Sequence, residues 1–150
     1  MTAPDPQARD LLVAPFYKGD SSGSLDLALQ PRSPRPGEVA DIDRAIGADS
    51  IRQALLLRLL TPLGSLDPLG HLGYGSLLHE LIGQLNTPTT RQLARSYTLR
   101  AISQDPRVEE VLDLQVLEPT EAGKNTVRIQ VMVKAMKLTE PIELGIEVAL

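Results

Sequence analysis

The sequence predicts an α+β fold, a two-layer domain in which three helices pack on a three-stranded, mainly antiparallel C-terminal sheet. Two observations support this class. Apolar residues recur at helical spacing through residues 45–105, and the last third of the chain alternates apolar and polar residues as strands do. A sheet with one apolar face needs a cover, and amphipathic helices provide one. With 150 residues and 42% hydrophobic content, the chain can build one such core.

The first part of the chain, residues 1–44, is expected to be a Pro/Gly-rich extended arm that precedes the domain of residues 45–150. Half of the 12 prolines fall in this part, and residues 19–24 read GDSSGS. A solvated tail is one interpretation, because such a composition offers little apolar surface to bury. An arm that becomes ordered on a partner is the other interpretation. Phe16 and Tyr17 favour the second, because they are apolar anchors.

Two of the three helices have clear start signals. Ser50 followed by Gln53 makes a capping-box pattern at the start of the first helix. Thr87 followed by Pro88 places a capping side chain and a first-turn proline at the start of the third, which is expected to run to about residue 104. Both segments carry apolar residues at helical spacing, so each has a face to bury.

A glycine-rich loop, residues 62–75, follows the first helix. It carries no nucleophile–base pair, and a long loop between anchored elements usually has a function, so we expect it to make contacts rather than to perform chemistry. Ser76 is the expected cap of the second helix, whose apolar face would come from the leucines and isoleucine of residues 77–85.

Three strands are predicted, over residues 111–117, 126–135 and 142–150. If the last strand lies at the edge of the sheet, its backbone can accept a strand from another chain. The alternative is a plain edge that Glu143 and Glu147 protect. The partner-binding platform is expected to include the apolar alternating residues of the last two strands: Val127, Ile129, Val131, Val133, Ile142, Leu144, Ile146 and Val148.

The composition excludes several kinds of site. The chain has no cysteine, so it has neither a disulfide nor a thiolate metal site. His79 and Glu80 resemble the start of a HExxH zinc motif, but Gly83 stands where its second histidine belongs. Asp67 and Glu80 have no fixed spacing that would make them a glycosidase pair. We therefore expect no catalytic residues, no metal, no cofactor and no enzymatic activity.

The charge distribution points to protein partners. A net charge of −4 argues against nucleic acid as a partner, because binding its phosphates requires a cationic surface. The chain shows no signal peptide and no apolar run long enough to span a bilayer, so no membrane insertion is expected. Arg91 and Arg95 share a face of the third helix, either as solvated residues or as a contact for an acidic partner subunit.

Several segments of the sequence resemble the small baseplate wedge protein of contractile phage tails. Its relatives are the sheath initiator of phage-like contractile injection systems and a wedge protein of type VI secretion baseplates. The segments that carry the resemblance are Ile51–Ala54, Arg58–Gly64, His71–Leu78, Leu81–Gly83, Asn86–Thr87 and Asp105–Val108. They cover about residues 45–118, and the β-rich end agrees in kind.

The resemblance implies a structural protein of a tail-like particle. Its implied partners are the sheath protein, other baseplate wedge and hub proteins, and the tail tube, in sixfold symmetry. It implies that the C-terminal sheet initiates sheath assembly by accepting a strand from the first sheath ring. The particle would assemble in the bacterial cytoplasm, with release outside the cell left open.

The chain departs from the family at three positions of the loop region. The family typically carries Glu, Pro and Arg where this chain has Ser65, Leu72 and Leu77, so we expect apolar packing to bury Leu72 and Leu77. Two other functions stay open beside the structural one. They are a tail-associated cell-wall hydrolase and a soluble regulatory binding domain of the same fold.

Overall fold

The computed structural model describes residues 9–11, 44–119 and 124–150, and the chain divides into two compact units at Gln53 and Ala54. In the first unit, β1 (Arg9–Leu11) pairs antiparallel with β2 (Arg44–Ile46). The helix α1 (Ala48–Leu60) begins in this unit and ends in the second. β1 was not predicted. The rest of the expected arm, including Phe16 and Tyr17, lies outside the described residues.

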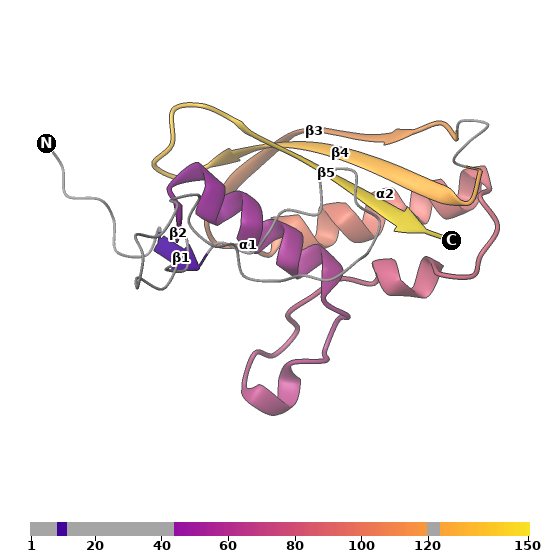
Figure 1. Cartoon of the computed structure of the whole chain (residues 1–150), viewed down its shortest axis with the longest axis horizontal. Coiled ribbons are helices and arrows are strands. Elements are labelled where there is room, and N and C mark those ends of the chain that lie inside the picture. The colour runs from indigo at the N-terminus through magenta and orange to yellow at the C-terminus, as the bar shows by residue number, and fades with distance from the viewer. Residues whose placement is uncertain (1–8, 12–43, 120–123) are drawn as a thin grey trace, which may run out of the picture. The chain divides into compact units, whose positions relative to one another are not determined.

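The second unit contains a three-stranded antiparallel sheet in the order β3-β4-β5 (Figure 1). The strands are β3 (Val108–Leu117), β4 (Thr126–Ala135) and β5 (Ile142–Ala149), close to the predicted ranges. The helix α2 (Pro88–Ser103) lies along one face of this sheet. The α+β class and the antiparallel sheet therefore agree with the sequence, whereas the number of helices does not.

The core of the second unit is aliphatic and is centred on β4 and β5. The side chains of these strands on the side of the sheet where α2 lies are at most 9% exposed. From α2, the small residues Ala94, Thr98 and Ala101 are buried, which lets the helix approach the sheet closely. Thr98 satisfies its buried hydroxyl by donating to the carbonyl of Ala94 at 2.8 Å. Leu55 and Leu59 of α1 and Leu78 and Leu81 of the following loop are buried as well.

The predicted second helix is wrong, because the described residues contain two α-helices and only a single 3₁₀ turn, η3 (Leu78–Leu81), in its place. The backbone of Ser76 is paired with that of Pro62 on one side, and Gly83 has a φ of +85° on the other. Six residues between these two points are too few to nucleate a stable α-helix. The predicted apolar face is consequently not formed, and Leu85 is 81% exposed.

The structure confirms the predicted end of α1 and the predicted start of α2. α1 ends at Leu60, where Thr61 donates its hydroxyl to the carbonyl of Leu57 at 2.7 Å. It begins two residues before the expected cap, Ser50, which is buried inside the helix. At the start of α2, the Thr87 hydroxyl accepts a hydrogen bond from the Thr90 amide at 3.1 Å, and Pro88 is the first helical residue.

β3 is the less regular edge of the sheet. Its register with β4 shifts twice, between Val108 and Glu110 and again between Val111 and Asp113. Most of its side chains are exposed or half-buried. Register shifts of this kind twist an edge strand and interrupt its ladder. The opposite edge, β5, pairs with β4 through eight consecutive residues without a shift.

The close approach at Gly75 yields a stability prediction. Gly75 has a φ of +116°, and a Cβ there would lie 2.6 Å from the carbonyl oxygen of Thr61. We expect Gly75→Ala to lower the free energy of unfolding by about 3 kcal/mol. The substitution strains the backbone of residue 75, and the backbone of Thr61 and Pro62 must also move to make room for the Cβ. Gly70→Ala is the matched control, since Gly70 has a φ of +88° with open space around it. Its cost should be only about 1–2 kcal/mol, from backbone conformation alone. Urea denaturation of both variants measures the difference, and equal losses would contradict the crowding at Gly75.

Candidate functional site

The candidate site is the outer edge of β5. Within the described part of the chain, β5 pairs only with β4. The amide of Leu150 donates to the carbonyl of Asn125 at 2.7 Å, which makes these two residues a hydrogen-bonded pair. Hydrogen-bonded pairs alternate along an antiparallel ladder, so Ile146 and Val148 also point their backbone groups toward β4. By the same alternation, Gly145, Glu147 and Ala149 point theirs away from the sheet, into the open edge.

The side chains along this edge have a simple pattern on the solvent face. Glu143 and Glu147 are exposed, and Gly145 stands between them. Glu147 accepts an ion-pair contact from Arg128 of β4 at 2.7 Å, and both side chains are about half exposed. A pair of this kind adds little stability by itself. It nevertheless fixes the position of one carboxylate beside the open edge.

The structure places the predicted platform residues of β4 and β5 inside the molecule. Their side chains form the core-facing side of the sheet, so what these strands present outside is the backbone of β5 and its polar face. The platform as the sequence defined it is therefore a buried surface within one chain. The eight residues, in chain order, are Val127, Ile129, Val131, Val133, Ile142, Leu144, Ile146 and Val148.

The two arginines of α2 do not form one stripe. The Arg91 side chain is 17% exposed, donates to the Asn86 side chain at 3.1 Å and lies 3.4 Å from the carboxylate of Glu118. Asn86 in turn donates to the carbonyl of Lys124, so this cluster ties the start of α2 to the start of β4. Arg91 is thus part of the internal framework, whereas Arg95 is exposed.

The glycine-rich loop is internally bonded and extends away from α2 and the sheet (Figure 1). The Asp67 carboxylate accepts the amide of Gly73 at 2.9 Å, and Asp67 begins the 3₁₀ turn η2 (Asp67–Leu69). Leu69 and Leu72 lie on this loop and are 74% and 82% exposed. The expectation that Leu72 is buried is therefore wrong, and Leu77 is only half-buried. The loop offers apolar side chains on a preformed backbone.

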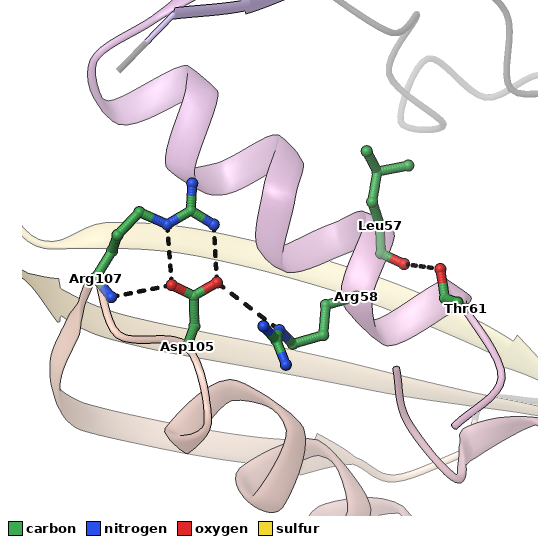
Figure 2. Close-up of polar contacts among 5 residues, drawn as sticks. All are labelled: Leu57, Arg58, Thr61, Asp105 and Arg107. Carbon is green, nitrogen blue, oxygen red and sulfur yellow. Dashed lines mark hydrogen bonds and ion pairs between the residues drawn. The ribbon is translucent and has the colours of Figure 1, made fainter. Parts of the chain in front are cut away.

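The base of the loop is held by a carboxylate that the sequence analysis did not single out. Asp105 follows α2 directly and is 3% exposed. Its two oxygens accept from Arg107 at 3.0 Å (backbone amide), 2.9 Å (Nε) and 2.8 Å (Nη2), as Figure 2 shows. On the other side, Nε of Arg58 lies 3.7 Å from Oδ2 of Asp105 (Figure 2). The guanidinium of Arg58 also lies over the Tyr74 ring, 4.4 Å from its centre.

The charges around Asp105 determine its protonation. Burial alone would raise the pKa of this carboxyl, because it penalises the charged form. The hydrogen bonds and charge of Arg107, together with the charge of Arg58, outweigh burial and lower the pKa below its ordinary value of 3.8. Asp105 is thus a structural anion that joins α1, the loop and β3. Its only signal in the sequence is an Asp-Pro-Arg step after a helix.

The groups that the sequence analysis considered for chemistry can be located among the described residues. No group of three or more His, Asp or Glu side chains among them is placed to hold a metal ion. A small cavity near the loop has room for about one water molecule, and no carboxylate lines it. Asp67 accepts the Gly73 amide within the loop, and Glu80 is exposed on η3. No helix in the described ranges has the length and apolar character needed to cross a bilayer.

Removing the charge of Asp105 tests the clamp that its carboxylate forms with Arg58 and Arg107. We expect Asp105→Asn to lower the free energy of unfolding by about 3 kcal/mol, because Arg58 and Arg107 lose their buried counterion. Asp113→Asn is the matched control. Asp113 is an exposed carboxylate of β3 that contacts Gln115, and its loss should change stability by less than about 0.5 kcal/mol. Denaturation by urea compares the two, and an Asp105→Asn variant as stable as the control would show that the clamp contributes nothing.

The lowered pKa of Asp105 also predicts a pH dependence. A carboxyl whose pKa is lower in the folded state stabilises the fold above its unfolded pKa, and this stabilisation is lost as the pH falls through the folded pKa. The stability difference between the native chain and Asp105→Asn should therefore be constant from about pH 5 to 7 and shrink below about pH 4. Denaturation at a series of pH values measures this difference. A difference that grows on acidification would contradict the direction of the pKa shift.

Comparison with known proteins establishes the fold. No protein-family model matches the sequence, and a search for relatives among curated proteins found none. The structure is similar to that of a protein from Geobacter sulfurreducens that is provisionally described as a tail lysozyme. The two share 21% sequence identity with a TM-score of 0.55, over 67% of this chain and 87% of that one. This chain therefore has the same fold as a protein assigned to a tail.

Proposed function

We propose that this chain is a structural component of the baseplate of a contractile phage tail or contractile injection system. In this role β5 accepts an extended arm from the first ring of sheath subunits. The observation that carries the proposal is the open edge of β5, where Gly145, Glu147 and Ala149 direct their backbone groups away from the sheet. An added strand gains main-chain hydrogen bonds there without any change in the core. The resemblance to baseplate wedge proteins and the tail-assigned structural neighbour support the same setting.

Other contacts complete the proposed assembly. The loop with its exposed Leu69 and Leu72 is the second contact surface, suited to a neighbouring wedge or hub protein. Arg95 is available for an acidic subunit, whereas Arg91 is engaged inside the chain. The tube, and sixfold copies of the chain around it, follow from the resemblance. Neither nucleic acid nor a membrane is among the proposed partners, and the particle assembles in the bacterial cytoplasm.

A cell-wall hydrolase is the second candidate, because the structural neighbour is described as a tail lysozyme. Glycosidases of that kind place two carboxylates about 5–10 Å apart across a substrate cleft. The described residues support the structural role better, since the cavity lacks a carboxylate and Asp67 is bonded into its loop. We propose that the chain is not an enzyme. Incubation of the purified chain with peptidoglycan tests this, and turnover that Asp67→Asn or Glu80→Gln abolishes would replace the structural proposal.

A proline at Glu147 tests strand addition at β5. Glu147→Pro removes an outward-facing amide while keeping the inward hydrogen bonds of Ile146 and Val148, so the chain should fold and enter the baseplate. We expect particles with baseplates and tubes but few assembled sheaths when the variant replaces the native chain. Electron microscopy of purified particles counts the sheathed and bare tubes.

The opposite edge provides the control. Val116 of β3 lies opposite Ile129, whose backbone groups point toward Ile146 of β5, so the amide of Val116 points out of the other edge. Val116→Pro removes that outward donor, and sheath assembly should stay normal. Normal sheaths on Glu147→Pro with the variant incorporated, or bare tubes on Val116→Pro alone, would place the sheath contact elsewhere.

A further inference from the structure

Gly145 lies in the middle of β5, at a position where the fold does not require a glycine. It has no left-handed φ, and a Cβ at this position would lie no closer than 3.8 Å to any atom, the nearest being the Ile129 carbonyl oxygen. Neither a turn nor internal crowding therefore requires glycine. Glycine weakens a strand, and an interior strand glycine often marks the close approach of another chain. The structure thus contains a notch on the solvent face of β5.

The neighbours of the notch are acidic. Side chains two residues apart in a strand lie on the same face, so Glu143 and Glu147 flank Gly145 on either side. Both carboxylates are exposed, and Glu147 is held in place by Arg128. Along the edge that a newly added strand meets, an acidic side chain therefore stands on each side of a position that has no side chain.

We propose that the segment that adds to β5 carries an aromatic residue over Gly145, with a lysine or arginine two positions away on each side. This inference rests on the proposed strand addition and supplies the side-chain pattern of the incoming strand. An aromatic ring on the incoming strand covers the exposed backbone of an edge glycine. The two cations meet Glu143 and Glu147 as cross-strand pairs of opposite charge.

A second copy of this chain fits the edge poorly. Antiparallel pairing of two β5 strands centred on Gly145 would place Glu143 of each copy directly opposite Glu147 of the other. Like charges in directly opposed positions are unfavourable. The charge pattern therefore favours a different chain with basic residues at these positions.

A peptide titration of the full-length protein tests the pattern. The probe has seven residues, with tyrosine at the centre, lysine two positions away on each side and threonine at the remaining positions. The comparison peptides replace the tyrosine by alanine or both lysines by glutamate. We expect the tyrosine–lysine peptide to bind about tenfold more tightly than either and to shift the amide signals of Gly145, Glu147 and Ala149 in ¹⁵N NMR spectra.

Variants of the notch separate fit from folding. Gly145→Ala should melt no lower than the native chain, because its Cβ has room. Gly145→Leu fills the notch and should bind the tyrosine peptide about tenfold more weakly, down to the affinity of the alanine peptide. Gln115→Leu is the matched control, since it places the same side chain on the same face of the sheet but on the far edge strand, where Gln115 pairs with Gln130 and Gln130 with Gly145. Its affinity for the tyrosine peptide should stay within about threefold of native.

Each other outcome has a definite meaning. Equal binding of all three peptides at β5 would overturn the side-chain pattern and leave strand addition in place. Shifts centred on another strand, or none at millimolar peptide, would overturn the pattern too. Sheath assembly on Glu147→Pro then decides strand addition independently, because that experiment does not depend on the sequence of the arm.

Discussion

The contact on which the rest of the second unit depends is the buried carboxylate of Asp105. It receives three hydrogen bonds from Arg107 and the charge of Arg58, so the last turn of α1 and the first residues before β3 meet at one anion. Arg58 in turn lies over Tyr74, which brings the end of the glycine-rich loop to the same point. A charge so deeply buried is stable only when it is fully paired, so the geometry of all three segments is coupled.

This coupling explains how a chain with little aromatic content holds an elaborate loop in place. The aliphatic core is non-directional, and it fixes the distance between α2 and the sheet better than it fixes the path of a loop. Directional bonds supply the missing information. Ser76 donates to the Leu59 carbonyl at 2.6 Å and accepts from the Leu78 amide at 3.2 Å, while Asp67 closes the tip. These bonds fix the backbone of the loop, and a preorganised loop loses less entropy when it binds a partner.

The sequence was a good guide wherever one local rule decided the outcome. Strict alternation predicted β4 and β5, and the Thr87-Pro88 step predicted the start of α2 to the residue. It failed for the second helix, because pairing with Pro62 and the conformation of Gly83 override the helical pattern of the leucines. It also missed Asp105, since an exposed and a buried carboxylate look alike without the residues that fold against them.

The partner-binding residues show a different limit of sequence reasoning. Period-two alternation tells which residues of β5 share a face, but not whether that face is buried in the chain's own core or meets another chain. The apolar face turned out to be the core, so Ile142, Leu144 and Ile146 are buried within the chain. What remains at the open edge is the backbone, whose hydrogen-bonding direction follows from the register and from the hydrogen bond between Leu150 and Asn125. That information is geometric, and no residue type reveals it.

The irregular register of β3 has a consequence for growth of the sheet. The two register shifts leave this strand a poor template, whereas β5 is straight in register over its whole length. A sheet with two equal open edges can propagate from both sides into a fibre. A sheet with one regular and one irregular edge has only one good template, so the irregular register of β3 disfavours side-by-side stacking of the free protein without limit.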